Sequence, residues 1–497
     1  MLTKDAIGKL VNRYRAVLKK CRLMNVFGSL ALVAMLIAGG MVCPVSAQEG
    51  VTDISQSQDW IEDTILKNHA LVGSFNDKTF TIKNGATLSF DTQLKDSVQW
   101  KYPKYTFSTG VVTILANNGS SVTINGEATQ EGKFPVITIT NKNNNEYWSG
   151  DMGSEVGSNY AVASYGEQSH LSFNNVNLNL DHVAEGIYAA EKGSIYIDNE
   201  FVNITADHFD ELQHHAIVAQ DGSTIDIKSK SVKLHVNGIS TEKNDPYTVF
   251  SSGIHTTYGG NIKIDAEDSL SVIVETKNEA TDRAQNYGVY ALGQYGTEGS
   301  IKLSGKNFEL KVSGAKRNNN IGLLAGALGE SSSLSAEFKN ISIQSAGEGI
   351  TSETMSGQAD NFESKISVTA ADKLEIDAPN GIVANTRWGK NTIATAANSL
   401  SINSDDFVIL NWSDFTKNNT ASTNIAVTGN NITLLSQNYG VYSDVRNQNG
   451  NTSLIDVQGD TELTINAPLV AYSFSGDGSK TGEGTINLNT NGCGRTD

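Results

Sequence analysis

The feature of this 497-residue sequence that most constrains its fold is an internal repeat. Each unit opens with a short apolar run that begins at a small residue, and two further runs follow after turns rich in Gly, Ser, Asn and Asp. The openings recur mostly about 27–37 residues apart, at Gly186, Ala216, Gly253, Gly288, Gly322, Gly349, Gly381 and Gly440. The last interval is close to two units, and Ile409 and Leu410 can open the missing one. A repeat of this length indicates a chain built by stacking equivalent units.

Apolar and polar side chains often alternate within the runs, which is the period of a half-buried β-strand. Three short strands cannot bury their apolar side alone, but a chain that coils each unit onto the previous one does bury it. A β-propeller also repeats, but its four-stranded blades need longer units. The sequence therefore predicts an all-β fold, a right-handed parallel β-helix. It is a three-faced β-solenoid of about 10–12 coils, and its hand is taken from the general crossover preference.

The first 47 residues have a different character. They hold seven basic residues and one acidic residue, an apolar run at 26–42, and a small-residue pattern that ends at Ala47. Basic, apolar and then small is the order of a secretory signal peptide. We therefore expect a signal peptide helix, cleaved between Ala47 and Gln48. Lipidation of Cys43 fits less well, because the residues before it match the lipidation pattern poorly.

The basic lead-in of this signal is longer than export requires. Its stretch at 12–20, Asn-Arg-Tyr-Arg-Ala-Val-Leu-Lys-Lys, resembles the extended signal region of Gram-negative autotransporters, and the repeat resembles their β-helical passengers. The resemblance implies a passenger exposed at the outer membrane surface or released outside the cell. Such proteins continue into a membrane β-barrel, and no barrel pattern precedes Asp497. We therefore expect either a truncated chain, which we favour and whose only membrane link is a missing C-terminal barrel, or a secreted solenoid that uses another export route.

The sequence divides into three parts. Residues 1–47 are the extended signal peptide, 48–160 an N-terminal cap with irregular first coils, and 161–497 the regular coils. Within the second part, the segment 60–66 can form a short amphipathic helix or an irregular cap. Terminal units of a solenoid are expected to be atypical, because they close the open end of the core.

Charge and cysteine content limit the function. The chain has 37 basic and 54 acidic residues, and without the signal 30 basic and 53 acidic residues remain, a net charge of −23. This balance argues against a nucleic-acid partner, which requires a basic surface. It suits a soluble secreted protein. Only Cys493 remains after cleavage, so the fold has no disulfide framework and depends on stacking.

A dense group of metal-ligand residue types lies at 207–215. His208, Asp210, His214 and His215 are its weak candidate metal ligands, with Asp207 and Glu211 beside them. Histidines and carboxylates this close can hold a divalent ion. The spacing matches no established pattern, however, and a solvated turn between coils collects the same residue types. We therefore predict no metal site.

No motif predicts a catalytic residue or a cofactor. The pair Asp405 and Asp406 raises the alternative of a polysaccharide lyase or glycoside hydrolase, since such β-helices place carboxylates on one outer face. An adjacent acidic pair after a strand is more often a turn. A Gly-x-Ser-x-Gly elbow is absent, and the segment 478–481 lacks the Gly-Lys step of a phosphate loop.

Tyrosines recur at one place in the repeat. Tyr188, Tyr290 and Tyr442 each follow an opening glycine by two residues, and Tyr287 and Tyr439 precede the glycine. The first three predict an aromatic ladder. It either faces a glycan or protein ligand or, as we favour, stabilises adjacent coils.

These observations lead to one functional prediction and two alternatives. We expect a non-enzymatic, secreted or surface-exposed passenger that mediates adhesion to a host-surface glycan or protein. A polysaccharide-cleaving β-helix is the first alternative, and three or more charged residues from different coils in one groove would favour it. A structural spacer is the second alternative. No feature of the sequence specifies the ligand or the oligomeric state.

Overall fold

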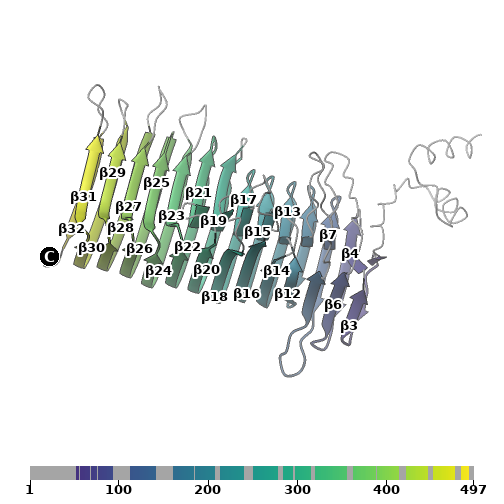
Figure 1. The fold of residues 1–497 in the computed structure, drawn as a ribbon. Helices are drawn as coiled ribbons and strands as arrows, with labels where there is room; N and C mark the ends of the chain where they lie inside the picture. Colours follow the sequence, from purple (N-terminus) through teal and green to yellow (C-terminus); the bar gives the residue numbers. More distant parts are fainter. Residues whose placement is uncertain are drawn as a thin grey trace, which may run out of the picture. The chain divides into compact units, whose positions relative to one another are not determined.

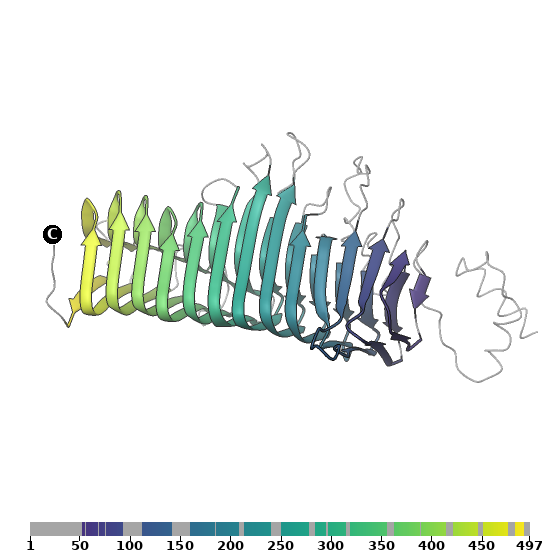
Figure 2. The ribbon, with the colours of Figure 1, turned by 90° about the horizontal axis from the view of Figure 1, so that it is seen from below.

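The computed structural model is an all-β parallel β-helix, in which the strands stack in sequence order along one axis (Figures 1 and 2). It describes residues 52–92, 112–141, 160–207, 213–239, 250–277, 284–314, 319–354, 362–413, 421–445, 451–475 and 483–491, except 55, 68, 75, 184, 295, 296 and 388. The predicted signal peptide lies outside the described residues. Within them, no helix has the length and apolar character needed to cross a bilayer.

The first sheet contains 14 strands, one from each coil, and neighbouring strands pair in parallel. Its strands are, in spatial order, β1 (Thr52–Ile54), β4 (His69–Ser74), β7 (Val112–Asn117), β10 (Tyr160–Tyr165), β13 (Glu185–Ala190), β15 (Gln213–Gln220), β17 (Phe250–Thr257), β19 (Gln285–Gln294), β21 (Asn320–Leu328), β23 (Glu348–Thr354), β25 (Asn380–Thr386), β27 (Phe407–Ser413), β29 (Tyr439–Val445) and β31 (Leu469–Ser475).

The second sheet contains 18 strands, and these are short in the first coils and long afterwards. The short strands are β2 (Asp59–Trp60), β3 (Thr64–Lys67), β5 (Lys78–Ile82), β6 (Thr87–Thr92), β8 (Ser121–Gly126), β9 (Val136–Asn141), β11 (His170–Asn174) and β12 (Asn177–Val183). The others are β14 (Ser194–Ala206), β16 (Thr224–Ile239), β18 (Asn261–Lys277), β20 (Gly299–Ser313), β22 (Ser332–Ser345), β24 (Glu363–Asp377), β26 (Gly389–Ser404), β28 (Ala421–Ser436), β30 (Thr452–Asn466) and β32 (Glu483–Thr490).

Each long strand joins the second and third runs of a repeat unit. The short strands β11 and β12 both pair with β14, which shows the two runs merging into one strand. In β22, the buried apolar side chains are Leu334, Ala336 and Phe338 and then, after a change of phase, Ile341 and Ile343. The register with β24 shifts at the same place. Such an irregularity turns the strand, so each coil has three faces, as the sequence predicts.

The glycines that open the units lie where the first sheet passes closest to the next coil. A Cβ atom on Gly253 would lie 2.7 Å from the carbonyl oxygen of Gly288, and one on Gly288 would lie 2.6 Å from that of Gly322. Neither distance leaves room for a side chain. The repeat of small residues therefore reflects the tight packing of one coil on the next.

The core runs between the two sheets along the whole stack. Ile187, Ile217 and Ile254 are in register on successive strands of the first sheet and fully buried. Buried polar groups also form ladders between coils, since the Asn286 side-chain amide donates to the Asn320 side-chain oxygen at 3.2 Å. Stacking of like residues thus satisfies both apolar and polar side chains.

Two details differ from the sequence prediction. The first sheet has 14 strands, against 10–12 expected coils, because the early segment adds strands in the same register as the later ones. The segment 60–66 does not form the helix that was one of its two predicted structures, since the short strands β2 and β3 lie there and pair in parallel with β5 and β6. Tertiary pairing with the next coil overrides its weak helical pattern.

Candidate functional site

The outer face of the first sheet carries the aromatic residues singled out in the sequence. Tyr188, Tyr290 and Tyr442 all occupy one register column of this face, which means that they lie at aligned positions of the paired strands. They are not neighbours, because Val218 and His255 separate the first two and four coils separate the last two. Each tyrosine therefore belongs to a different local group.

Tyr188 packs in the first of these groups. Its ring centroid lies 4.5 Å from that of Tyr160, and the Gln220 side-chain amide donates to its hydroxyl at 2.5 Å. The residue is buried, and burial raises the pKa of the Tyr188 phenol well above its usual value. This tyrosine joins adjacent coils as a structural residue.

Tyr290 belongs to the central aromatic group, which we define as His215, Phe250, His255, Tyr287 and Tyr290. The His255 and Tyr290 rings are parallel within 2° at a centroid distance of 5.0 Å, and those of Tyr287 and Tyr290 are stacked at 4.9 Å. His215 Nδ1 lies 2.6 Å from the Ser252 hydroxyl. These rings come from three successive strands, β15, β17 and β19.

Burial dominates the electrostatics of the central aromatic group. It lowers the pKa of His255 to about 4, and together with His255 and His214 it lowers the pKa of His215 well below its usual value. Burial also raises the pKa of Tyr287 to about 12 and raises that of Tyr290 further. All four groups are therefore neutral at pH 7.

Two carboxylates occupy the same face on β23, which lies two coils beyond β19. The Thr351 hydroxyl donates to Glu348 Oε2 at 2.6 Å, and the Asn385 amide donates to Glu353 Oε1 at 3.0 Å. Burial raises the pKa of Glu348 to about 7, and it also raises that of Glu353, where Arg387 opposes the effect. Sequence inspection missed this pair, although Glu348 precedes Gly349 just as Tyr287 and Tyr439 precede their glycines.

Tyr442 belongs to the terminal aromatic patch, which we define as Phe407, Trp412, Tyr439, Tyr442, Tyr472 and Phe474 on β27, β29 and β31. Phe407 stacks on Tyr439 at 4.8 Å, and Tyr442 stacks on Tyr472 at 5.1 Å. In contrast to the other groups, these rings reach solvent: Trp412 is 44% exposed, Tyr472 40% and Tyr439 36%. β31 is the last described strand of the sheet, but Trp412 lies two coils inside it.

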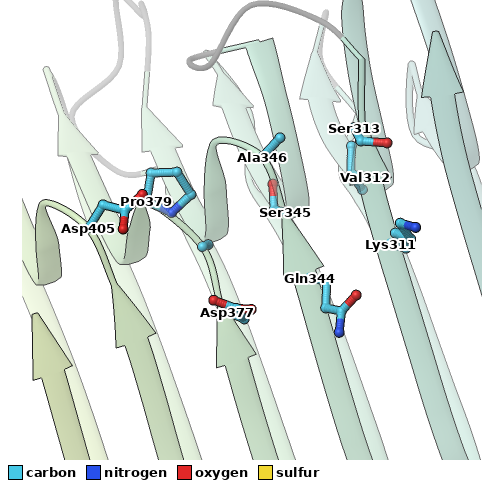
Figure 3. A pocket seen from close by; sticks show the side chains of 10 residues that line it. Lys311, Val312, Ser313, Gln344, Ser345, Ala346, Asp377, Pro379 and Asp405 are labelled. Atoms are coloured by element: carbon cyan, nitrogen blue, oxygen red, sulfur yellow. The ribbon is translucent and has the colours of Figure 1, made fainter. Parts of the chain in front are cut away.

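A groove of about 250 Å³ crosses the third face of the coil, at the ends of β20, β22 and β24 (Figure 3). Lys311, Gln344, Asp377 and Asp405 line it from successive coils. Both carboxylates have amide partners: Asn403 donates to Asp377 at 3.2 Å, and Gln437 donates to Asp405 at 3.0 Å.

The remaining residues singled out in the sequence are dispersed. His208 and Asp210 lie outside the described residues, whereas His214 and His215 lie buried on β15. Across the described ranges, no group of three or more His, Cys, Asp or Glu side chains is arranged to hold a metal ion. Asp405 and Asp406 lie in the turn between β26 and β27, where the Asn438 amide donates to Asp406 at 2.9 Å.

Comparisons of the chain with protein-family models, with curated proteins and with solved structures find no match. The class of protein is therefore defined by the fold, a parallel β-helix whose first sheet carries aromatic residues on its outer face.

Proposed function

We propose that this protein is an exported, non-catalytic binding protein, an autotransporter-like passenger that acts as an adhesin at the cell surface or outside a Gram-negative bacterium. The terminal aromatic patch is the observation that supports binding, because a contiguous exposed apolar surface on a soluble protein commonly marks an interaction site. The basic, apolar and small-residue order at 1–47 supports export.

The chemistry of the terminal aromatic patch suits recognition of a host glycan or protein. Trp and Tyr rings offer a large contact area with few rotatable bonds, so their ordering on binding costs little entropy. The patch also rests on paired strands, which hold Phe407 and Tyr439 in register on adjacent coils. A ligand would therefore meet a surface that is already in place.

The experiment compares two double variants of residues 48–497 on a glycan array and on host cells. Trp412→Ala with Tyr439→Ala removes two exposed rings of the patch, and we expect it to abolish saturable binding. Ile61→Ala with Ile65→Ala removes exposed apolar side chains far from the patch and serves as the control. Equal binding by both variants would reject the patch as the adhesive surface.

The groove favours the alternative of a polysaccharide-cleaving enzyme, because Lys311, Asp377 and Asp405 come from different coils. However, amide side chains of neighbouring residues and coils already bind both carboxylates, as turn and ladder residues do. A polysaccharide digestion screen on the same preparation distinguishes the two functions. New reducing ends that disappear in Asp377→Asn would replace the adhesin proposal with an enzyme, and neither binding nor cleavage would leave a structural spacer.

A further inference from the structure

We propose that the outer face of the first sheet holds a site for an arginine side chain of a partner protein, between the ring pair Tyr287 and Tyr290 and the carboxylates Glu348 and Glu353. The inference states which chemical group of a partner protein the proposed adhesin would recognise. It rests on the proposed binding function, but it does not depend on the terminal aromatic patch. The site lies on β19 and β23 and shares no residue with the terminal aromatic patch.

Gly326 brings the rings and the carboxylates together. It lies in register between Leu292 of β19 and Glu353 of β23. A Cβ atom on Gly326 would lie 3.3 Å from Tyr290 Cε2 and 3.6 Å from the Tyr290 hydroxyl. The Tyr290 ring therefore extends over the intervening coil in the direction of Glu353, through space that a larger residue would fill.

The Tyr290 hydroxyl has no hydrogen-bond partner among the described residues, although the residue is only 8% exposed. The oxygen itself is not among the fully buried atoms that lack a partner, so it remains accessible to a ligand. The neighbouring Tyr287 hydroxyl, by comparison, donates to Gln285. The open hydroxyl thus points to a hydrogen-bonding ligand above β21.

The two carboxylates also lack a direct cationic partner among the described residues. In the described part of the chain, neither Glu348 nor Glu353 forms an ion pair, and each accepts a hydrogen bond from an uncharged side chain. Burial is the main cause of their raised pKa values, and a positive charge placed against them would favour the ionised form. Arg387 is the basic residue that acts on Glu353, but its side chain is exposed and forms no ion pair with it.

A guanidinium group fits this combination better than other cations. Its plane stacks on a tyrosine ring, and its donors pair with carboxylates in a fixed geometry. Contacts in which both partners are charged are among the stronger hydrogen bonds. The net charge of −23 on residues 48–497 also attracts basic partners to the protein before specific contact.

The test uses calorimetric titration of residues 48–497 with a short blocked peptide that contains one arginine, and with the same peptide carrying neutral citrulline. We expect the arginine peptide to bind about tenfold more tightly. Glu348→Gln with Glu353→Gln should remove that difference, and Tyr290→Phe should reduce it a few-fold. Circular dichroism melting confirms that each variant is folded.

The matched control is Glu309→Gln with Glu337→Gln, which removes two exposed carboxylates from the second sheet. If this control loses as much affinity as the site variant, the attraction is only general charge and the proposal is wrong. Equal affinity for arginine and citrulline peptides would also overturn it. If the Glu348 and Glu353 variant loses its preference for the arginine peptide while the Trp412 and Tyr439 variant keeps it, this site is distinct from the terminal aromatic patch.

Discussion

The central aromatic group and the terminal aromatic patch occupy equivalent positions on the same face, yet one is buried and the other exposed. Tyr290 and Tyr442 even share a register column. The difference lies in their neighbours: Tyr290 lies against His255 and above the gap at Gly326. Trp412, in contrast, lies between Asn385 and Asp444 in its column, and both are shorter than the indole. A large ring between short side chains projects into solvent.

This contrast indicates that position in the repeat does not decide whether an aromatic residue is structural or functional. The central rings fill space between coils and exclude water from polar atoms, including both ring nitrogens of His255, which have no hydrogen-bond partner within the described ranges. The exposed rings gain no comparable burial. Exposed apolar rings of this kind support the binding role proposed for the terminal aromatic patch.

The largest expected effect is on stability. Tyr290→Ala removes a buried ring with two stacked partners and should lower the free energy of unfolding by about 3–4 kcal/mol. Tyr439→Ala, at the exposed patch, should cost less than about 1 kcal/mol. Urea denaturation of residues 48–497 measures both. Similar losses at the two positions would mean that the groups do not differ in structural role.

A second, somewhat smaller effect on stability should appear at acidic pH. The pKa of His255 is about 4 in the folded protein and 6.5 in the unfolded chain, so the unfolded state holds more protons between these values. Stability should therefore fall as the pH drops from 6.5 to 4, by up to about 3 kcal/mol. His215 acts in the same direction, and the Phe250 and Tyr290 rings that face His255 offer no charge.

His255→Phe tests the acid effect because it keeps a ring against Tyr290 and removes the titrating group. The difference in unfolding free energy between pH 7 and pH 4.5 should shrink in this variant. Carboxylates elsewhere titrate in both proteins and cancel in the comparison. An unchanged difference would show that His255 does not contribute to acid sensitivity.

The repeat made the fold predictable from the sequence, because strand period, turn residues and opening glycines all recur. Gly288, for example, marks a close approach that follows directly from stacking. The sequence did not predict that the second and third runs of a unit merge into one strand, as in β14. Apolar and polar side chains alternate on both sides of the bend in that strand, so the pattern is the same for one bent strand and for two separate ones. The early coils were predicted only as irregular, because their strands lack the opening glycine and are separated by long connections.

The candidate site was harder to predict, because its members come from different coils. The tyrosine positions were visible as a pattern, but the exposure of Trp412 depends on Asn385 and Asp444, residues 27 positions before it and 32 after it. The proximity of Tyr290 to Glu353 likewise depends on Gly326 in the coil between them. Such relations require the register of the stack, which one sequence does not specify.

The smallest expected effect is a change in the pH dependence of stability at Glu348, which lies between the two aromatic regions. Its pKa is about 7 in the folded protein and 4.5 in the unfolded chain, so the folded state holds more protons in this window. Stability should fall as the pH rises from 4.5 through 7. The facing groups are Thr351, which donates a hydrogen bond, and Glu353, which adds negative charge.

Glu348→Gln removes this titration and should raise the free energy of unfolding at pH 8 by about 1 kcal/mol, with little change at pH 4.5. The gain is smaller than the full pKa shift would imply, because the side chain is partly exposed. Urea denaturation at the two pH values measures it, with Glu337→Gln as the exposed control. A variant that is more stable yet binds the arginine peptide less well would mean that Glu348 is retained at a cost to stability, as expected for a residue that serves a ligand. Lower stability at both pH values would instead assign it a structural role alongside the central aromatic group.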